Sequence, residues 1–335
     1  MDRRCAGRRA ISVTVARTRS VARTDTVRDR LRPPREPMGP RAGQAVAALM
    51  LAVSPVCIEL SGADAGTASV YRCLLALPAL VLLVLPEYRR EGPPPRRQLA
   101  YGLAGGVLFA GDMLLWTRAI TEVGAGLSTV LVNVQVVLVP LLAWAVDRER
   151  VPGRFLLWLP VLVAGVVLTG GLFEKGASGS DPAAGTLHAI LAALSYSGFL
   201  FLLRRGGFHG HVRTTYTAVV FSATVASALG GWAWGALDLA PPAGTLAWLA
   251  LAALTSGIIG WLMVAVYSPR LPSHVGAVLL LLTPVGALAL GALILGERPS
   301  PAQWAGAALI LVSAYATVTG RRGAPSPEED APRDA

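Results

Sequence analysis

Two ionisable side chains of opposite charge, Arg72 and Asp112, stand inside successive apolar stretches of the chain. On antiparallel membrane helices both would lie about 5 Å to the same side of the bilayer centre. A charge at that depth costs about 2.5–3.5 kcal/mol on insertion scales, so such residues pair with one another or face water. Two interpretations stay open: a structural ion pair, with Glu59 as a rival partner for Arg72, and a shared place in a cavity.

The cavity interpretation gives Asp112 a chemical role. A carboxyl group in a partly dry site can exchange a proton near neutral pH, so Asp112 is the hypothetical proton carrier. Trp116 lies one helical turn further along the same face. An aromatic ring beside a carboxylate suits an amine or an amino acid through cation–π contact. The alternative for Trp116 is an indole packed between helices.

Two amides, Asn133 and Gln135, interrupt the apolar segment "VLVNVQVVLVPLLAW". In a continuous helix they differ by about 200° around the axis, so we predict that they do not both line one cavity. Both amides are candidates for the cavity lining, one on each face of the helix, and we favour Asn133 as the one that faces the cavity. Gln135 is expected to hydrogen-bond a neighbouring helix, a contact worth about 0.6–2 kcal/mol.

Aromatic and hydroxyl side chains supply the matching candidates in the second half of the chain. These are Tyr196, Trp261 and Thr283, which directly precedes Pro284. A shift of 148 residues aligns Trp261 with Met113, the neighbour of Asp112. Tyr267 is expected near the outer membrane surface, as an aromatic residue of the interfacial belt.

Membrane helices must position these residues, because the composition is that of a membrane protein. Hydrophobic residues make up 53% of the 335 residues and charged residues 15%, and the mean hydropathy is +0.55. Apolar runs of about 20 residues recur, which is the length of a membrane-spanning helix. Membrane strands would be nearer ten residues and would alternate in polarity. The fold class is therefore an all-α helical membrane bundle.

Apolar runs between helix breakers predict ten membrane helices. They are placed at 44–60, 66–86, 98–119, 124–146, 154–173, 182–203, 213–235, 244–267, 273–295 and 301–320. Gly102, Gly106 and Ala110 form a stripe of small residues on the third helix, which predicts close helix packing.

The distribution of basic residues predicts the orientation, because Lys and Arg concentrate in cytoplasmic loops. We assign to the inner side Arg89, Arg90, Arg96, Arg97, Arg148, Arg150, Arg154, Arg204, Arg205, Arg213, Arg298, Arg321 and Arg322. We assign to the outer side Arg118, Lys175 and Arg270. Both termini are then cytoplasmic. Glu149 and Glu297 are also expected on the inner side, each as a cap of the helix that follows.

The chain contains a weak internal repeat. A shift of 148 residues superimposes "DRERVPG" (147–153) on "LGERPSP" (295–301). Each half has five spans, an odd number, so the second half enters the membrane inverted. Inverted repeats place a substrate site near the midplane between the halves and support alternating access. The expected organisation is a first repeat at 44–173 and a second at 182–320.

The two ends of the chain are expected to be disordered, at 1–43 and 321–335. Residues 1–41 hold twelve Arg against Asp2, Asp25, Asp29 and Glu36, which is a net charge of +8 out of +10. Met38 stands just before the first apolar run, so residues 1–37 are interpreted as the product of a misassigned start codon. A transit peptide is the alternative. No nucleic-acid partner is expected.

Three unpatterned cysteines, Cys5, Cys57 and Cys73, imply neither a disulfide framework nor a metal site. No cofactor is expected, and the nucleotide-binding pattern G-x-x-x-x-G-K-[ST] is absent from the sequence.

Several segments resemble the drug/metabolite transporter superfamily, specifically proteins with two EamA domains. They are "LFAGDMLLWTRAI" (108–120), "VGAGLSTVLVNVQVVLVPLLAW" (123–144) and "LLTPVGALALGALILGERPSPAQWAGAALILVSA" (281–314). The resemblance implies a ten-helix carrier of small metabolites with a central cavity lined by helices 1, 3, 4, 6, 8 and 9. One departure from the family pattern is Val136. The equivalent residue in the second half is Pro284, and the resemblance implies a proline at both positions. Without this proline one expected kink is missing, so the shape of helix 4 is not predicted.

The expected function is therefore secondary transport of an amino acid, an amine or a drug-like solute across the cytoplasmic membrane. Export is the expected direction, and proton coupling is a hypothesis that rests on Asp112. The expected partners are the solute, the lipid bilayer and protons, and the sequence leaves a homodimer open. A membrane-embedded enzyme would need clustered catalytic groups, and a channel would need a repeated filter. Neither pattern is visible, so no enzymatic activity is expected.

Overall fold

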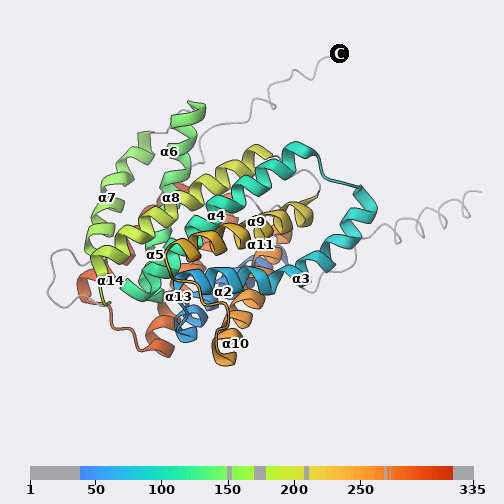
Figure 1. Ribbon diagram of the computed structural model, residues 1–335. Coiled ribbons are helices and arrows are strands. Elements are labelled where there is room, and N and C mark those ends of the chain that lie inside the picture. The colour runs from blue at the N-terminus through green and yellow to red at the C-terminus, as the bar shows by residue number, and fades with distance from the viewer. Residues whose placement is uncertain are drawn as a thin grey trace, which may run out of the picture. The chain divides into compact units, whose positions relative to one another are not determined.

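The computed structural model describes residues 38–148, 153–169, 179–206, 211–267, 270–271 and 273–319. All regular structure in these ranges is helical, as Figure 1 shows. Nearly all of the N-terminal arm, and the C-terminal tail, lie outside the described residues, so their expected disorder stays a prediction. The all-α class is confirmed for the part of the chain that the structure describes.

The first half contains six helical segments. They are α2 (Pro40–Ser61), α3 (Ala65–Glu91), α4 (Arg96–Val123), α5 (Ala125–Val132), α6 (Gln135–Asp147) and α7 (Gly153–Thr169). The second half contains α8 (Pro182–Gly206), α9 (Val212–Ala233), α10 (Ala243–Ala252), η1 (Ala253–Gly260), α11 (Trp261–Tyr267), α12 (Ser273–Leu280), α13 (Leu282–Leu290), η3 (Gly291–Leu295) and α14 (Pro301–Thr319). The segments η1 and η3 are π-helical.

Each of the ten predicted runs is occupied by a helix or by consecutive helical segments. Eight candidate spans in the described ranges are long and apolar enough to cross a membrane. A further apolar stretch, Leu156–Thr169 of α7, is shorter. The chain is thus a multi-span helical membrane protein.

The fourth and ninth predicted helices are both interrupted, and at equivalent places. The short helices α5 and α12 begin at Ala125 and Ser273, 148 residues apart, and they end at Val132 and Leu280, which are also 148 residues apart. The interruption therefore repeats in both halves, which agrees with the repeat inferred from the sequence offset.

Tight backbone turns make the interruption in the first half. The N–H of Asn133 donates to the carbonyl oxygen of Val130, and that of Val134 donates to that of Leu131, both at 3.0 Å. Bonds to the third preceding residue are those of a 3₁₀ turn. The side-chain amide of Asn133 donates to the Thr129 carbonyl oxygen at 2.8 Å. Helix 4 is therefore broken without a proline at Val136.

The two ends of the helical bundle can be told apart by α4, which runs from Arg96 to Val123. We call the end that carries Arg96 the basic end and the opposite end the Glu297 end. Glu297 belongs to the latter because it accepts hydrogen bonds from the N–H groups of Ala125, at 2.5 Å, and Gly126, at 3.1 Å.

This placement corrects two predictions about sidedness. Glu297 and the adjacent Arg298 lie at the end opposite to Arg96. We had predicted all three on the inner side. Tyr267 packs against Gly43 at the start of α2 and is 8% exposed, so it is buried at the basic end rather than outward and lipid-facing. The inverted repeat reverses equivalent segments, so the residues that follow helix 9 lie at the end opposite to those that follow helix 4. Arg270 and Arg298 exchange sides, which leaves the excess of arginine at the basic end unchanged.

The capping prediction for Glu297 was also wrong. The start of α14 is capped by Ser300 and Gln303: the Ser300 N–H donates to Gln303 Oε1 at 3.0 Å, and the Gln303 N–H donates to Ser300 Oγ at 3.1 Å. This reciprocal pair is a capping box, and its sequence signature was present. Glu297 instead caps α5 in the other half of the chain. Glu149 lies outside the described residues.

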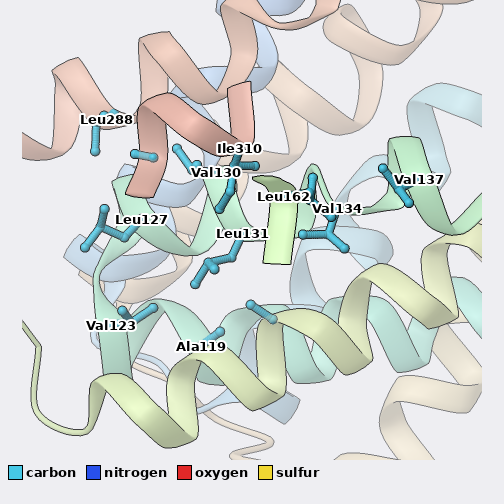
Figure 2. Close-up of a cluster of buried hydrophobic side chains, with 12 residues drawn as sticks. Ala119, Val123, Leu127, Val130, Leu131, Val134, Val137, Leu162, Leu288 and Ile310 are labelled. Atoms are coloured by element: carbon cyan, nitrogen blue, oxygen red, sulfur yellow. The ribbon is translucent and has the colours of Figure 1, made fainter. Parts of the chain in front are cut away.

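The helix α5 lies at the centre of a hydrophobic cluster. Figure 2 shows Leu127, Val130 and Leu131 of α5 together with Leu162 of α7 and Ile310 of α14. Seven of its eight residues are buried. Because apolar neighbours surround it, α5 is held on several sides, and it brings the following turn at Asn133 to a defined position.

The small-residue stripe on α4 packs against α9, as predicted. A Cβ atom on Gly102 would stand 3.2 Å from Thr215 Cγ2, and one on Gly106 would overlap the carbonyl oxygen of Val219. Ala110 is buried as well. The two backbones therefore approach each other more closely than larger residues would allow.

We expect Gly106→Ala to lower the free energy of unfolding by about 1–3 kcal/mol, because the added methyl group meets backbone that cannot rotate away. Gly111→Ala on the same helix is the control, since its Cβ would meet only the Ser195 side chain, at 3.4 Å. Thermal unfolding in detergent measures both. Equal melting temperatures for the two variants would contradict the close contact between α4 and α9.

Candidate functional site

A cavity of about 360 Å³ lies between the two halves of the bundle. Its first-half lining consists of Leu51, Ser54, Arg72, Phe109, Asp112, Trp116, Thr129, Val132, Asn133 and Gln135. Its second-half lining consists of Tyr196, Leu200, Ser256, Trp261, Val264, Leu280 and Thr283. The cavity is thus built from both repeats, and polar and apolar side chains line it in similar numbers.

All of the side chains that the sequence proposed for a substrate cavity line this one. They are Asp112, Trp116, Asn133, Gln135, Tyr196, Trp261 and Thr283, and Arg72 joins them. That they bind a substrate stays a prediction. Sequence reasoning missed Phe109 and Ser54 among others, although Phe109 stands three residues before Asp112 and therefore shares its helix face.

Arg72 is held by contacts other than an ion pair with Asp112. Its Nη1 donates to Ser54 Oγ at 3.3 Å, and its Cζ lies 5.3 Å from the centroid of the Trp116 ring. Ion pairs within 4.0 Å do form elsewhere in the described ranges, for example Arg118–Glu122 and His211–Glu91, but none joins Arg72 to Asp112 or to Glu59. The Arg72–Asp112 ion pair is therefore not formed as a direct contact, and neither is the rival pair with Glu59.

Asp112 is buried, with 7% of its surface exposed, yet no described residue donates a hydrogen bond to its carboxylate. The charge of Arg72 acts on it through space. A buried carboxylate without donors is unfavourable for stability. Such a group is available to a ligand cation or a proton that enters the cavity, so of the two open interpretations the geometry favours the cavity.

Asn133 and Gln135 both line the cavity, which contradicts the prediction that they could not. The predicted angle assumed a continuous helix, but α5 ends at Val132 and α6 begins at Gln135. Residues in a 3₁₀ turn advance by about 120° rather than about 100°, which brings the two side chains closer in direction. Gln135 makes no bond to a neighbouring helix: its Oε1 is buried and has no partner among the described residues.

Aromatic rings from the second half contribute to the cavity lining through Tyr196 and Trp261. The ring centroids of Tyr196 and Trp261 are 6.3 Å apart, and those of Tyr216 and Trp261 are 6.5 Å apart. The hydroxyl group of Tyr216 donates to the carbonyl oxygen of Gly257 in η1 at 2.9 Å. Because π-helical turns leave carbonyl groups irregularly oriented, η1 can accept this bond and fix Tyr216 behind Trp261.

Comparison with known proteins identifies the family. The EamA-like transporter family matches this chain twice, at residues 44–171 and 183–319. The chain belongs to this family. The resemblance inferred from the sequence motifs is therefore confirmed, and the two EamA matches correspond to α2–α7 and α8–α14.

Two individual proteins are similar to this EamA protein. An uncharacterized transporter of Synechocystis sp. is 28% identical over 271 residues, which cover 71% of this chain and 78% of the relative. A crystal structure, described only as that of a protein, aligns with a TM-score of 0.54 and 18% identity. It covers 84% of this chain and 97% of the other. At that identity the second likeness shows the fold alone.

We expect Asp112→Asn to raise the melting temperature of the solute-free protein, because it removes a buried charge that lacks donors. The free energy of unfolding should rise by about 1–3 kcal/mol, the usual penalty of a buried polar group without hydrogen-bond partners. Glu87→Gln is the control: its carboxylate accepts bonds from the N–H of Arg213, at 3.0 Å, and from the N–H and Oγ1 of Thr214, both at 2.7 Å. Glu87→Gln should lower the free energy of unfolding by about 1 kcal/mol. If Asp112→Asn destabilises as much as the control, Asp112 is structural.

Proposed function

We propose that this EamA protein is a secondary transporter that exports a small organic metabolite across the cytoplasmic membrane in exchange for protons. The observation that carries the proposal is the unpaired carboxylate of Asp112 in a cavity between the two repeats. A charged residue at membrane depth that neither pairs nor faces lipid is the usual mark of a transport pathway. The family match supports the transporter class.

The size and chemistry of the cavity suit an amino acid, an amine or a small drug-like cation. About 360 Å³ lies at the lower end of ordinary ligand sites. Asp112 offers an acceptor for an ammonium group, with the rings of Trp116 and Trp261 nearby for cation–π contact. Arg72 offers donors for a carboxylate. Because the two charges do not contact each other, a solute that carries both charges can bridge them.

The proposed topology has ten spans with both termini in the cytoplasm. Described arginines at the basic end are Arg41, Arg89, Arg90, Arg96, Arg97, Arg148, Arg154, Arg204, Arg205, Arg213 and Arg270. At the Glu297 end they are Arg118 and Arg298. Basic residues concentrate in the cytoplasm, so the basic end is the cytoplasmic one.

Proton exchange follows from the single carboxylate. A proton and a solute cation compete for Asp112, so the loaded carrier holds either one or the other. Release of the solute outside leaves a carboxylate that takes up a proton, and the proton must leave inside before the next solute binds. An inward proton gradient therefore drives export.

Counterflow in proteoliposomes tests this function. We expect unlabelled internal solute to accelerate the uptake of labelled solute, which a channel or an enzyme does not do. Amino acids, polyamines and cationic dyes are the solutes to test. We expect Asp112→Asn to reduce transport driven by a pH gradient at least tenfold, whereas Glu91→Gln, a change outside the cavity, leaves it unchanged.

Intact gradient-driven transport in Asp112→Asn would contradict the role of Asp112 in proton coupling. Flux of every tested solute without trans-stimulation would contradict the carrier mechanism as a whole.

A further inference from the structure

The structure suggests how one end of the cavity is kept closed. We infer that Glu297 closes the cavity at the Glu297 end by joining the second half of the chain to the first, and that this contact breaks when the cavity opens there. The inference rests on the proposed transport function, because a protein without alternating access would not need to open at that end.

Two hydrogen bonds form the contact. The carboxylate of Glu297 accepts from the N–H of Ala125 at 2.5 Å and from that of Gly126 at 3.1 Å. These N–H groups stand at the start of α5, where no helical carbonyl group is available to them. The helix start also carries a partial positive charge, which favours a carboxylate. The residues that meet are about 170 positions apart and belong to different repeats.

Three glycines leave the space that the carboxylate occupies. A Cβ atom on Gly124 would stand 2.9 Å from Glu297 Oε1, and one on Gly126 would stand 3.0 Å from Oε2. A Cβ atom on Gly291 would overlap Oε2. Gly124 and Gly126 come from the first repeat and Gly291 from the second. A space built by both repeats around one side chain indicates a specific contact rather than an incidental one.

The backbones of the two repeats also approach each other closely beside this contact. A Cβ atom on Gly126 would stand 2.8 Å from the Cα of Leu288, so α5 and α13 pack directly against each other. At the basic end, α6 has no comparable packing against α12 in the described ranges. The cavity between them is therefore closed at the Glu297 end and less tightly closed at the other, as expected for one state of an alternating-access carrier.

The helix α5 connects the contact to the cavity. Its first residues bind Glu297, and Thr129, Val132 and the following Asn133 line the cavity. Both sites therefore lie on, or directly after, a single helix of eight residues. A solute that displaces the cavity-lining end of α5 would therefore also displace the end that Glu297 holds.

The surroundings of Glu297 favour a contact that can break. Burial raises the pKa of Glu297, and the two N–H groups of α5 act against that rise. Glu59 of α2 interacts electrostatically with Glu297, and its Oε2 is buried without a partner among the described residues. The acceptor oxygens of Glu297, rather than a countercharge, hold the contact. A variant that lacks these oxygens should therefore release α5.

Access to a cysteine in the cavity tests the inference. The native Cys5, Cys57 and Cys73 are replaced by serine, and Val132→Cys serves as the reporter on the cavity wall. A membrane-impermeant thiol reagent is applied to oriented vesicles from each side in turn. A separate Leu239→Cys variant marks the Glu297 end, since Leu239 is 79% exposed and follows Asp238, which is bound to Thr67 at the start of α3.

We expect Glu297→Ala to raise the rate of Val132→Cys modification from the Glu297 end at least fivefold and to lower it from the basic end. Glu297→Gln keeps one acceptor oxygen and should give an intermediate rate. Glu87→Ala is the matched control, because it removes a carboxylate from the start of α9 at the basic end. It should leave the rate from the Glu297 end unchanged.

An unchanged rate from the Glu297 end in Glu297→Ala would overturn the inference. Cooperative thermal unfolding of the variant in detergent shows that it is folded. The measurement needs no transported solute, so it is independent of the proposed function. If the protein shows counterflow but Glu297→Ala leaves the access of the reagent to the cavity unchanged, only the role of Glu297 is refuted. If Glu297→Ala changes the access of the reagent to the cavity but no solute shows counterflow, the transport proposal is refuted and the inference about Glu297 stands.

Discussion

The buried carboxylate of Asp112 needs a water-accessible space, because no described residue donates to it and lipid cannot solvate it. The architecture around it meets this need. Arg72 is turned toward Ser54 and Trp116 rather than toward Asp112, and the interrupted helices carry polar backbone and amide groups to the same depth. Asp112 therefore faces a cavity of both repeats instead of a neutralising partner.

The helix interruptions are the means by which the two repeats make one cavity. In each half a helix of eight residues ends in a turn, at Asn133 in the first half and at Leu281 in the second. The turn changes the direction of the side chains and allows both Asn133 and Gln135 to face the same space. On the far side of α5, apolar packing against α7 and α14 holds the turn in position. The short helix α5 thus contributes both to the polar cavity and to the apolar core.

Much of this arrangement could be predicted from the sequence. Hydrophobic runs located the helices because membrane helices need continuous apolar length, and polar residues inside those runs pointed to the cavity because lipid excludes them. The separation of Arg72 from Asp112 could not be predicted, since it depends on Ser54 and Trp116 from other helices. The position of Gln135 could not be predicted because a 3₁₀ turn has no strong sequence signal. The partner of Glu297 lies about 170 residues away in the sequence, so no local pattern reveals it, and the inversion of the second repeat places Glu297 at the end opposite to Arg96.

The central claim is that one cavity holds a solute between Asp112 and Arg72, and ligand-induced stabilisation of the purified protein tests it most directly. A solute that binds only the folded state raises its melting temperature, and the stabilisation grows with the logarithm of the solute concentration above Kd. The account predicts that a solute with both an ammonium and a carboxylate group stabilises the protein. It predicts that this stabilisation is lost in Asp112→Asn and in Arg72→Gln. Neither substitution breaks a helix or introduces a new charge. Equal stabilisation of the wild-type protein and both variants would show that the solute binds elsewhere and would contradict the account.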